Sequence, residues 1–132
     1  MLRANLGDRV AIAPQTNQQR LIEQVRQAFE HLRAHCLKHM ALEEQDGYML
    51  AVVHRRPALT HEVERLAHEH GEMQQILERI HNELELLKPD DRLVIHDCCA
   101  RIRDVMGYIE HHESAENLLV FSAFTDDLGT TD

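Results

Sequence analysis

Two His-Glu pairs carry the most distinctive chemistry in this 132-residue chain. The patterns His39-x-x-x-Glu43 and His112-x-x-x-Glu116 each place an imidazole four residues before a carboxylate. On a helix that spacing puts both groups on one face, one turn apart, where both can reach the same metal ion. His70 interrupts a third apolar segment in the same way. Mixed nitrogen and oxygen ligands suit non-haem iron, with manganese and zinc as the other candidates.

The composition narrows the range of functions. Eleven histidines need an explanation, and a net charge of −9 disfavours binding to nucleic acid or to an anionic membrane surface. The apolar runs are too short to span a bilayer. Three cysteines do not form a disulfide framework and no secretory signal is visible, so we expect a cytoplasmic protein. No nucleophile–base pair, phosphate loop or nucleotide motif is present, so the sequence offers no residues for a conventional hydrolase, transferase or dehydrogenase. Whether the protein is an enzyme stays open, and a non-enzymatic role is favoured.

Helix signals predict an all-α, up-and-down antiparallel bundle with three long helices. Thr16 and Gln19 form a capping-box pattern at the start of the first helix, Pro57 ends it, and residues 88–90 form the second turn. Short connections force consecutive helices to run antiparallel. Residues 17–124 are expected to form one domain. The expected order is an irregular lead-in over residues 1–16, helices over 17–53, 60–87 and 91–123, and a polar tail over 125–132.

Each predicted helix has an apolar seam with a short polar interruption. At ~1.5 Å of rise per residue, the interruptions fall in nearly the same layer of the bundle, so we predict that they form one site. Carboxylates buried there without a lysine or arginine in the seams would be destabilising unless a cation neutralised them. His35 is either a further ligand or a hydrogen-bonding partner. The interrupting residues are His35, His39, Glu43 and Asp46 in the first helix, His70 in the second, and His112 and Glu116 in the third.

Several neighbours of these seams are expected to have lesser roles. Asp46 is interpreted as solvated, and Glu113 as an outer partner, with a ligand role left open. Tyr108 is expected to pack, and Cys36 and Cys98 to act as small apolar side chains. Seven histidines fall off the seams and are expected at the surface: His31, His54, His61, His68, His81, His96 and His111.

The motif Leu66-x-x-Glu69-His70, together with the two His-x-x-x-Glu pairs, resembles the haemerythrin-like family of HHE cation-binding domains. The resemblance covers roughly residues 30 to 121. It implies a four-helix bundle that holds a bridged di-iron centre and serves O₂ binding or the sensing of oxygen, nitric oxide or iron. It implies two iron atoms per site, with Glu43 and Glu116 as bridging carboxylates. The ligands implied by the resemblance are His39, Glu43, His70, His112 and Glu116.

The chain departs from this family at its N-terminal side. Family members have a first helix with its own ligand histidine, and no comparable helix precedes Asn17. His35 supplies the missing ligand, or a second chain does, or the site is incomplete. Three helices with apolar seams leave a groove uncovered, so we expect a homodimer. The ligands do not distinguish a carrier, a sensor, an iron store and an oxidase. The alternative function is a metal-free or structurally metallated helical dimer that acts as an interaction or signalling module.

Overall fold

The computed structural model describes residues 17–129, except the side chains of Asp46, Tyr48 and residues 126–129. The predicted lead-in over residues 1–16 lies outside this described part. Within it the chain is all-helical, as the sequence predicts. The elements are α2 (Asn17–Asp46), α3 (Tyr48–Arg55), the short 3₁₀ helix η1 (Pro57–Leu59), α4 (Thr60–Glu85) and α5 (Arg92–Gly129).

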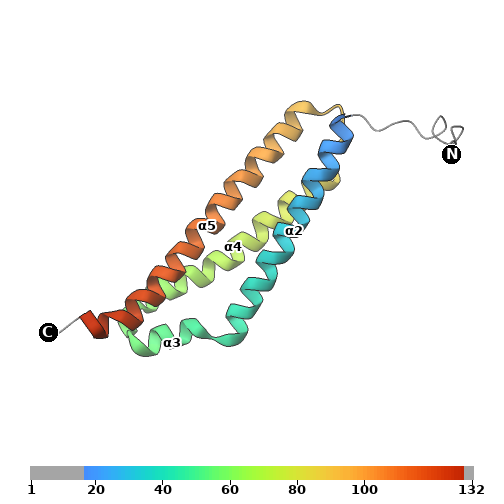
Figure 1. Cartoon of the computed structure of the whole chain (residues 1–132). Coiled ribbons are helices and arrows are strands. Elements are labelled where there is room, and N and C mark those ends of the chain that lie inside the picture. The colour runs from blue at the N-terminus through green and yellow to red at the C-terminus, as the bar shows by residue number, and fades with distance from the viewer. Residues whose placement is uncertain (1–16, 130–132) are drawn as a thin grey trace, which may run out of the picture.

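Three long helices form the body of the molecule. Helices α2, α4 and α5 alternate in direction along one long axis, and α3 crosses the end of the bundle where α2 stops (Figure 1). Helix α4 packs against both other long helices, whereas α2 and α5 contact each other much less. This arrangement is the up-and-down bundle expected from the short connections.

The predicted first helix over residues 17–53 is broken at Gly47. This glycine has the left-handed backbone angles φ 63° and ψ 30°, which a side chain disfavours. Its N–H still donates to the carbonyl of Glu43 at 3.1 Å, so α2 ends there in a regular turn. The apolar pattern continues beyond Gly47 because α3 buries Val52 against other helices rather than extending α2.

The buried face of α2 differs from the predicted seam. The periodicity predicts a seam through Leu21, His35, His39 and Leu42, with a flanking row that includes Ile22, Phe29 and Cys36. In the structure the flanking residues Ile22, Phe29 and Cys36 are buried, together with Met40. Within the predicted seam, Leu21 and Leu42 are exposed, and so are His35 and His39. The reason is that α2 packs mainly on α4, so its core is centred on the face turned towards that helix.

The end of the bundle opposite α3 is held by a side chain of α2. Arg26 donates from Nε to the carbonyl oxygen of Leu84 at 2.7 Å and from a terminal nitrogen to that of Leu87 at 3.3 Å. These carbonyls belong to the last turn of α4 and its exit, where helical partners are lacking. Helix α5 continues past the predicted end at Ala123, because no helix breaker occurs before Gly129.

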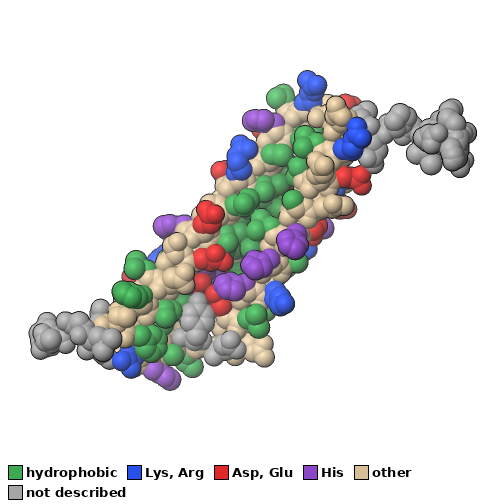
Figure 2. Space-filling model, viewed as in Figure 1, with side chains coloured by type: hydrophobic (Ala, Val, Ile, Leu, Met, Phe, Trp, Pro, Cys, Tyr) green, Lys and Arg blue, Asp and Glu red, His purple; other side chains and the backbone are tan. Residues whose placement is uncertain are grey.

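A groove lined by apolar side chains runs between α2 and α5 and has a volume of about 330 Å³. Figure 2 shows hydrophobic side chains exposed in a band between these helices. Among the described residues, no helix is both long enough and apolar enough to cross a bilayer. The groove is lined by Val25, Ala28, Phe29, Leu32, Cys99, Ile102, Arg103 and Met106.

Candidate metal centre

Four side chains from three helices converge in the half of the bundle that lies next to α3 (Figure 1). The sequence predicts such a convergence, because the polar interruptions of the seams fall in nearly the same layer. Glu43 comes from α2, His70 from α4, and His112 and Glu116 from α5. Each offers one ligand atom, and these four atoms all lie within 4.8 Å of one another. The group therefore has the size of a site for a metal ion.

The two histidines direct their Nε2 atoms at shared carboxylates. His70 Nε2 lies 3.1 Å from Glu43 Oε1 and 3.3 Å from Glu116 Oε2. His112 Nε2 lies 2.9 Å from the same Glu116 oxygen. The two rings are tilted by 52° with centroids 4.9 Å apart, so they face a common point without stacking.

The opposite ring nitrogens are held by a second pair of carboxylates. His112 Nδ1 lies 2.7 Å from Glu69, and His70 Nδ1 lies 3.3 Å from Glu44. Glu69 in turn accepts a hydrogen bond from Arg65 at 3.0 Å. In metal sites, a histidine that ligates through one nitrogen usually donates its other N–H to such an oxygen, which fixes the ring and its tautomer.

Burial makes this group chemically demanding. His112, Glu116 and His70 expose only 2%, 3% and 7% of their surface, and the Glu43 side chain exposes 11%. Two carboxylates held this far from water destabilise the fold unless positive charge or protons neutralise them. A divalent cation would balance both charges at once.

Burial and the hydrogen bonds within the cluster shift the pKa values of all four members. Burial and a hydrogen bond with Glu116 raise the pKa of Glu43. The hydrogen bond to Glu116 raises the pKa of His70, against the effect of burial. Burial lowers the pKa of His112, but its hydrogen bonds to Glu116 and Glu69 outweigh this and raise it. For Glu116 burial acts upwards, yet the hydrogen bonds from both histidines hold its pKa far below the ordinary value. In the absence of metal, these hydrogen bonds favour the protonated form of both histidines, whose positive charge offsets that of the carboxylates.

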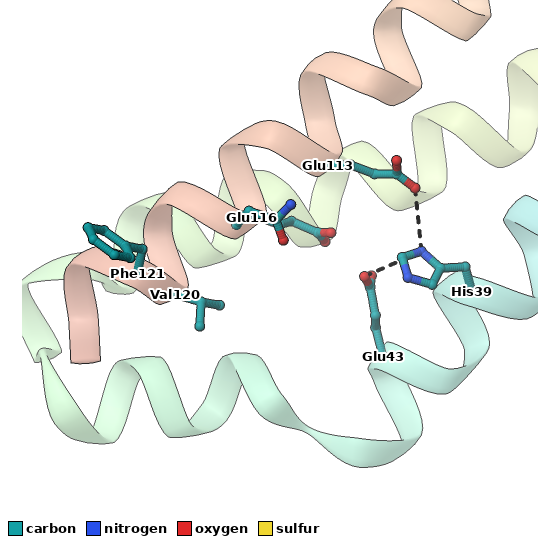
Figure 3. Close-up of a pocket in the computed structure, with 7 residues that line it drawn as sticks. His39, Glu43, Glu113, Glu116, Val120 and Phe121 are labelled. Carbon is teal, nitrogen blue, oxygen red and sulfur yellow. Dashed lines mark ion pairs between the residues drawn. The ribbon is translucent and has the colours of Figure 1, made fainter. Parts of the chain in front are cut away.

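An open cleft connects the cluster with solvent. It has a volume of about 700 Å³ and lies between α2 and α5, above α3. Figure 3 shows Glu43 and Glu116 pointing into it and His39 at its rim. The Nδ1 atom of His39 lies 3.6 Å from a carboxylate oxygen of Glu43 and 3.6 Å from one of Glu113. These three groups form an exposed extension of the buried cluster.

The structure brings together four of the six predicted ligands and places the other two outside. His39 lies beside the cluster, in contact with Glu43, and its side chain is 46% exposed. His35 is exposed one turn closer to the N-terminus of α2, and its ring stacks on that of His39 with centroids 6.2 Å apart. His35 therefore does not reach the cluster in this arrangement.

The neighbours differ in how they relate to the site. Glu113 contacts His39, as an outer partner would. Tyr108 packs against the core but also donates its hydroxyl to Glu72 at 2.9 Å, away from the cluster. Cys36 and Cys98 are buried, as expected for small apolar side chains.

Sequence reasoning gave no role to Glu44, Glu69 or Arg65. Glu44 and Glu69 each stand next to a predicted ligand in the sequence, which was the available signal. The sequence does not reveal that Glu69 holds a histidine of another helix. It precedes His70 in the chain, yet it contacts His112 on α5.

Comparisons with protein-family models, with curated proteins and with solved structures found no match to this chain.

Proposed function

We propose that the protein binds a redox-active metal, iron above all, at the cluster of Glu43, His70, His112 and Glu116. One observation carries this proposal. Both histidines turn Nε2 towards the central carboxylates, while their Nδ1 atoms are occupied by Glu44 and Glu69. This is the polarity that two neutral imidazole ligands need, with lone pairs directed inwards and N–H groups held from outside.

The choice of iron rests on the donor set. Two imidazoles and two carboxylates form a mixed nitrogen–oxygen site, which suits non-haem iron and also accepts manganese or zinc. Thiolate ligands are not part of the described cluster, which makes a structural zinc site of the cysteine type the poorer fit. Bound iron would supply the capacity to take up a small ligand and to change oxidation state.

A dinuclear centre of the haemerythrin-like type is the finer form of this proposal. Glu43 also contacts His39, which lies near Glu113 at the mouth of the cleft. A second ion would use these exposed groups, with Glu43 and Glu116 shared between both ions. The cleft would admit O₂ or NO from solvent, so the proposed role is the binding or sensing of such small molecules, or the handling of iron.

The opening test is metal analysis after anaerobic reconstitution with Fe(II). After desalting, we expect about two iron atoms per chain in the wild type, as in other di-iron bundles. Glu43→Gln/Glu116→Gln should lose them. A matched control is Glu78→Gln/Glu83→Gln, which removes two carboxylates that pair with Arg33 and Arg101 at the surface.

The outcomes separate the candidate functions. Iron retention in the control together with near-ultraviolet and visible absorption in the wild type supports an iron centre. Retention of a single ion supports a mononuclear site. If the wild type retains no metal after desalting, the hydrogen-bonded cluster is structural, and the alternative of a metal-free interaction module takes precedence.

A further inference from the structure

Helix α2 carries three histidines that are not members of the buried cluster. His31, His35 and His39 follow one another at intervals of four residues, so they form one stripe along the helix. All three are exposed. Figure 2 shows a row of histidine side chains along α2, beside the band of hydrophobic side chains, with acidic groups near its lower end.

The geometry within the stripe suits shared binding of a cation. The rings of His35 and His39 are nearly parallel, with an interplanar angle of 6° and centroids 6.2 Å apart. Side chains four residues apart on a helix have Cβ atoms about 5–6 Å apart, so two imidazoles can chelate one ion with small changes of rotamer. Within the described part of the chain, no hydrogen bond or ion pair engages the ring nitrogens of His31 or His35. Both rings are thus available for ligation.

The stripe ends at the candidate metal centre. His39 belongs to both features: it stacks on His35 and lies 3.6 Å from Glu43, a member of the buried cluster. Glu113, also 3.6 Å from His39, adds negative charge at the same point. A cation held between His35 and His39 would therefore be one ligand exchange away from the carboxylates of the cleft.

We propose that His31, His35 and His39 form an exposed capture site for divalent transition-metal ions, from which an ion passes to the buried cluster. Imidazole ligands favour iron, nickel, copper and zinc over magnesium and calcium, so the stripe selects ions of that class. The inference of a capture site depends only on the three histidines of the stripe, whereas the transfer step rests on the proposed function. No bond other than metal–ligand bonds changes, and each ligand exchange leaves the ion's charge unaltered.

The first experiment isolates the stripe and uses Ni(II) as the probe. In Glu43→Gln/Glu116→Gln, we expect one weakly bound Ni(II) per chain by isothermal titration. Adding His31→Gln/His35→Gln should weaken this binding by roughly tenfold or more, since the chelating pairs are lost. The matched control adds His61→Gln/His96→Gln, which removes two exposed histidines on α4 and α5 and should leave the affinity unchanged.

The second experiment measures loading of the otherwise intact chain with Ni(II) by stopped-flow competition against a coloured chelator. His31→Gln/His35→Gln should slow loading several-fold, while the number of tightly bound Ni(II) ions, counted after desalting has removed the weakly bound ion, stays that of the wild type. Wild-type loading rates in this variant, or an equal loss of binding in the His61→Gln/His96→Gln control, would overturn the capture site. Ni(II) bound by the stripe in a wild type whose buried cluster takes no metal would refute the proposed function and the transfer step, but leave the capture site standing.

Discussion

Glu69 on α4 and His112 on α5 are joined by a 2.7 Å contact between a carboxylate oxygen and Nδ1, although 43 residues separate them in the chain. Because Nδ1 is held in this way, Nε2 of the same ring points at Glu116, 2.9 Å away. Arg65 steadies Glu69 from the solvent side. One outer carboxylate thus determines which nitrogen of a buried histidine faces the candidate metal centre.

Removing the charge of Glu69 should weaken metal binding without removing a ligand. For Glu69→Gln we expect a loss of about 10–100-fold in metal affinity, the usual effect of losing such an outer partner. Glu72→Gln is the matched control. Glu72 lies on α4 one turn after Glu69, accepts a hydrogen bond from Tyr108 and is not a member of the cluster. Titration of both variants with Zn(II) measures the difference, and equal affinities would show that Glu69 does not orient His112.

Metal should stabilise the fold through the central carboxylates. An ion that binds only the native state at a free concentration 100 times its Kd adds about 2.7 kcal/mol to the free energy of unfolding. Adding Fe(II) under anaerobic conditions should therefore raise the Tm of the wild type but not that of Glu43→Ala/Glu116→Ala. Equal increases in both proteins would place the stabilising ion elsewhere, on the surface histidines.

The pH dependence of stability should change sign with metal. In the metal-free protein, the raised pKa values of His70 and His112 give stability that is fully present below about pH 6.5. That contribution is lost as the pH rises through the higher pKa values of the folded state. The raised pKa of Glu43 acts in the same direction, whereas the lowered pKa of Glu116 gives stability that is lost only on acidification.

Urea unfolding between pH 6 and pH 9 should accordingly show the metal-free protein losing stability as the pH rises. With excess Zn(II) the trend should reverse, because deprotonated histidines bind the ion more tightly. His112→Gln should flatten the slope of the metal-free protein. A metal-free stability that is independent of pH across this range would contradict the assigned hydrogen bonds.

The groove between α2 and α5 leads us to expect a dimer. Its lining is apolar, Leu21 and Met106 are exposed on its two helices, and no third helix of the described chain covers it. A second copy laid on this face would bury the groove. Light scattering at micromolar concentration should give twice the 15.3 kDa chain mass, and Met106→Glu should reduce it to the mass of one chain. A wild-type mass near that of one chain, unchanged on concentration, would contradict the expected dimer.

Two glycines should respond to alanine in opposite directions. Gly47 has a positive φ of 63°, so Gly47→Ala should destabilise the fold by roughly 1 kcal/mol. Gly107 lies inside α5 with open space around an added Cβ, so Gly107→Ala should stabilise it by about as much. Urea unfolding of both variants measures these effects, and destabilisation by Gly107→Ala would mean that the α5 surface packs against something there.

The sequence by itself determined the helical class, the two turns near Pro57 and Pro89, and the layer that holds the candidate site. Helical periodicity and proline act locally, and the rise per residue converts sequence distance into height along a bundle. For the same reason, the sequence predicts one group of six residues, and the structure brings four of them together: Glu43, His70, His112 and Glu116. The other two predicted members, His35 and His39, are exposed on α2.

Only the tertiary structure decided which face of α2 is buried and which carboxylate holds which ring. The two apolar rows of α2 are similar in sequence, and the choice depends on the direction from which α4 packs. That choice exposes His35 and His39 and creates the stripe. The contact of Glu69 with His112 depends on the rotation of α4 against α5, a relation between two helices that no spacing within either helix encodes.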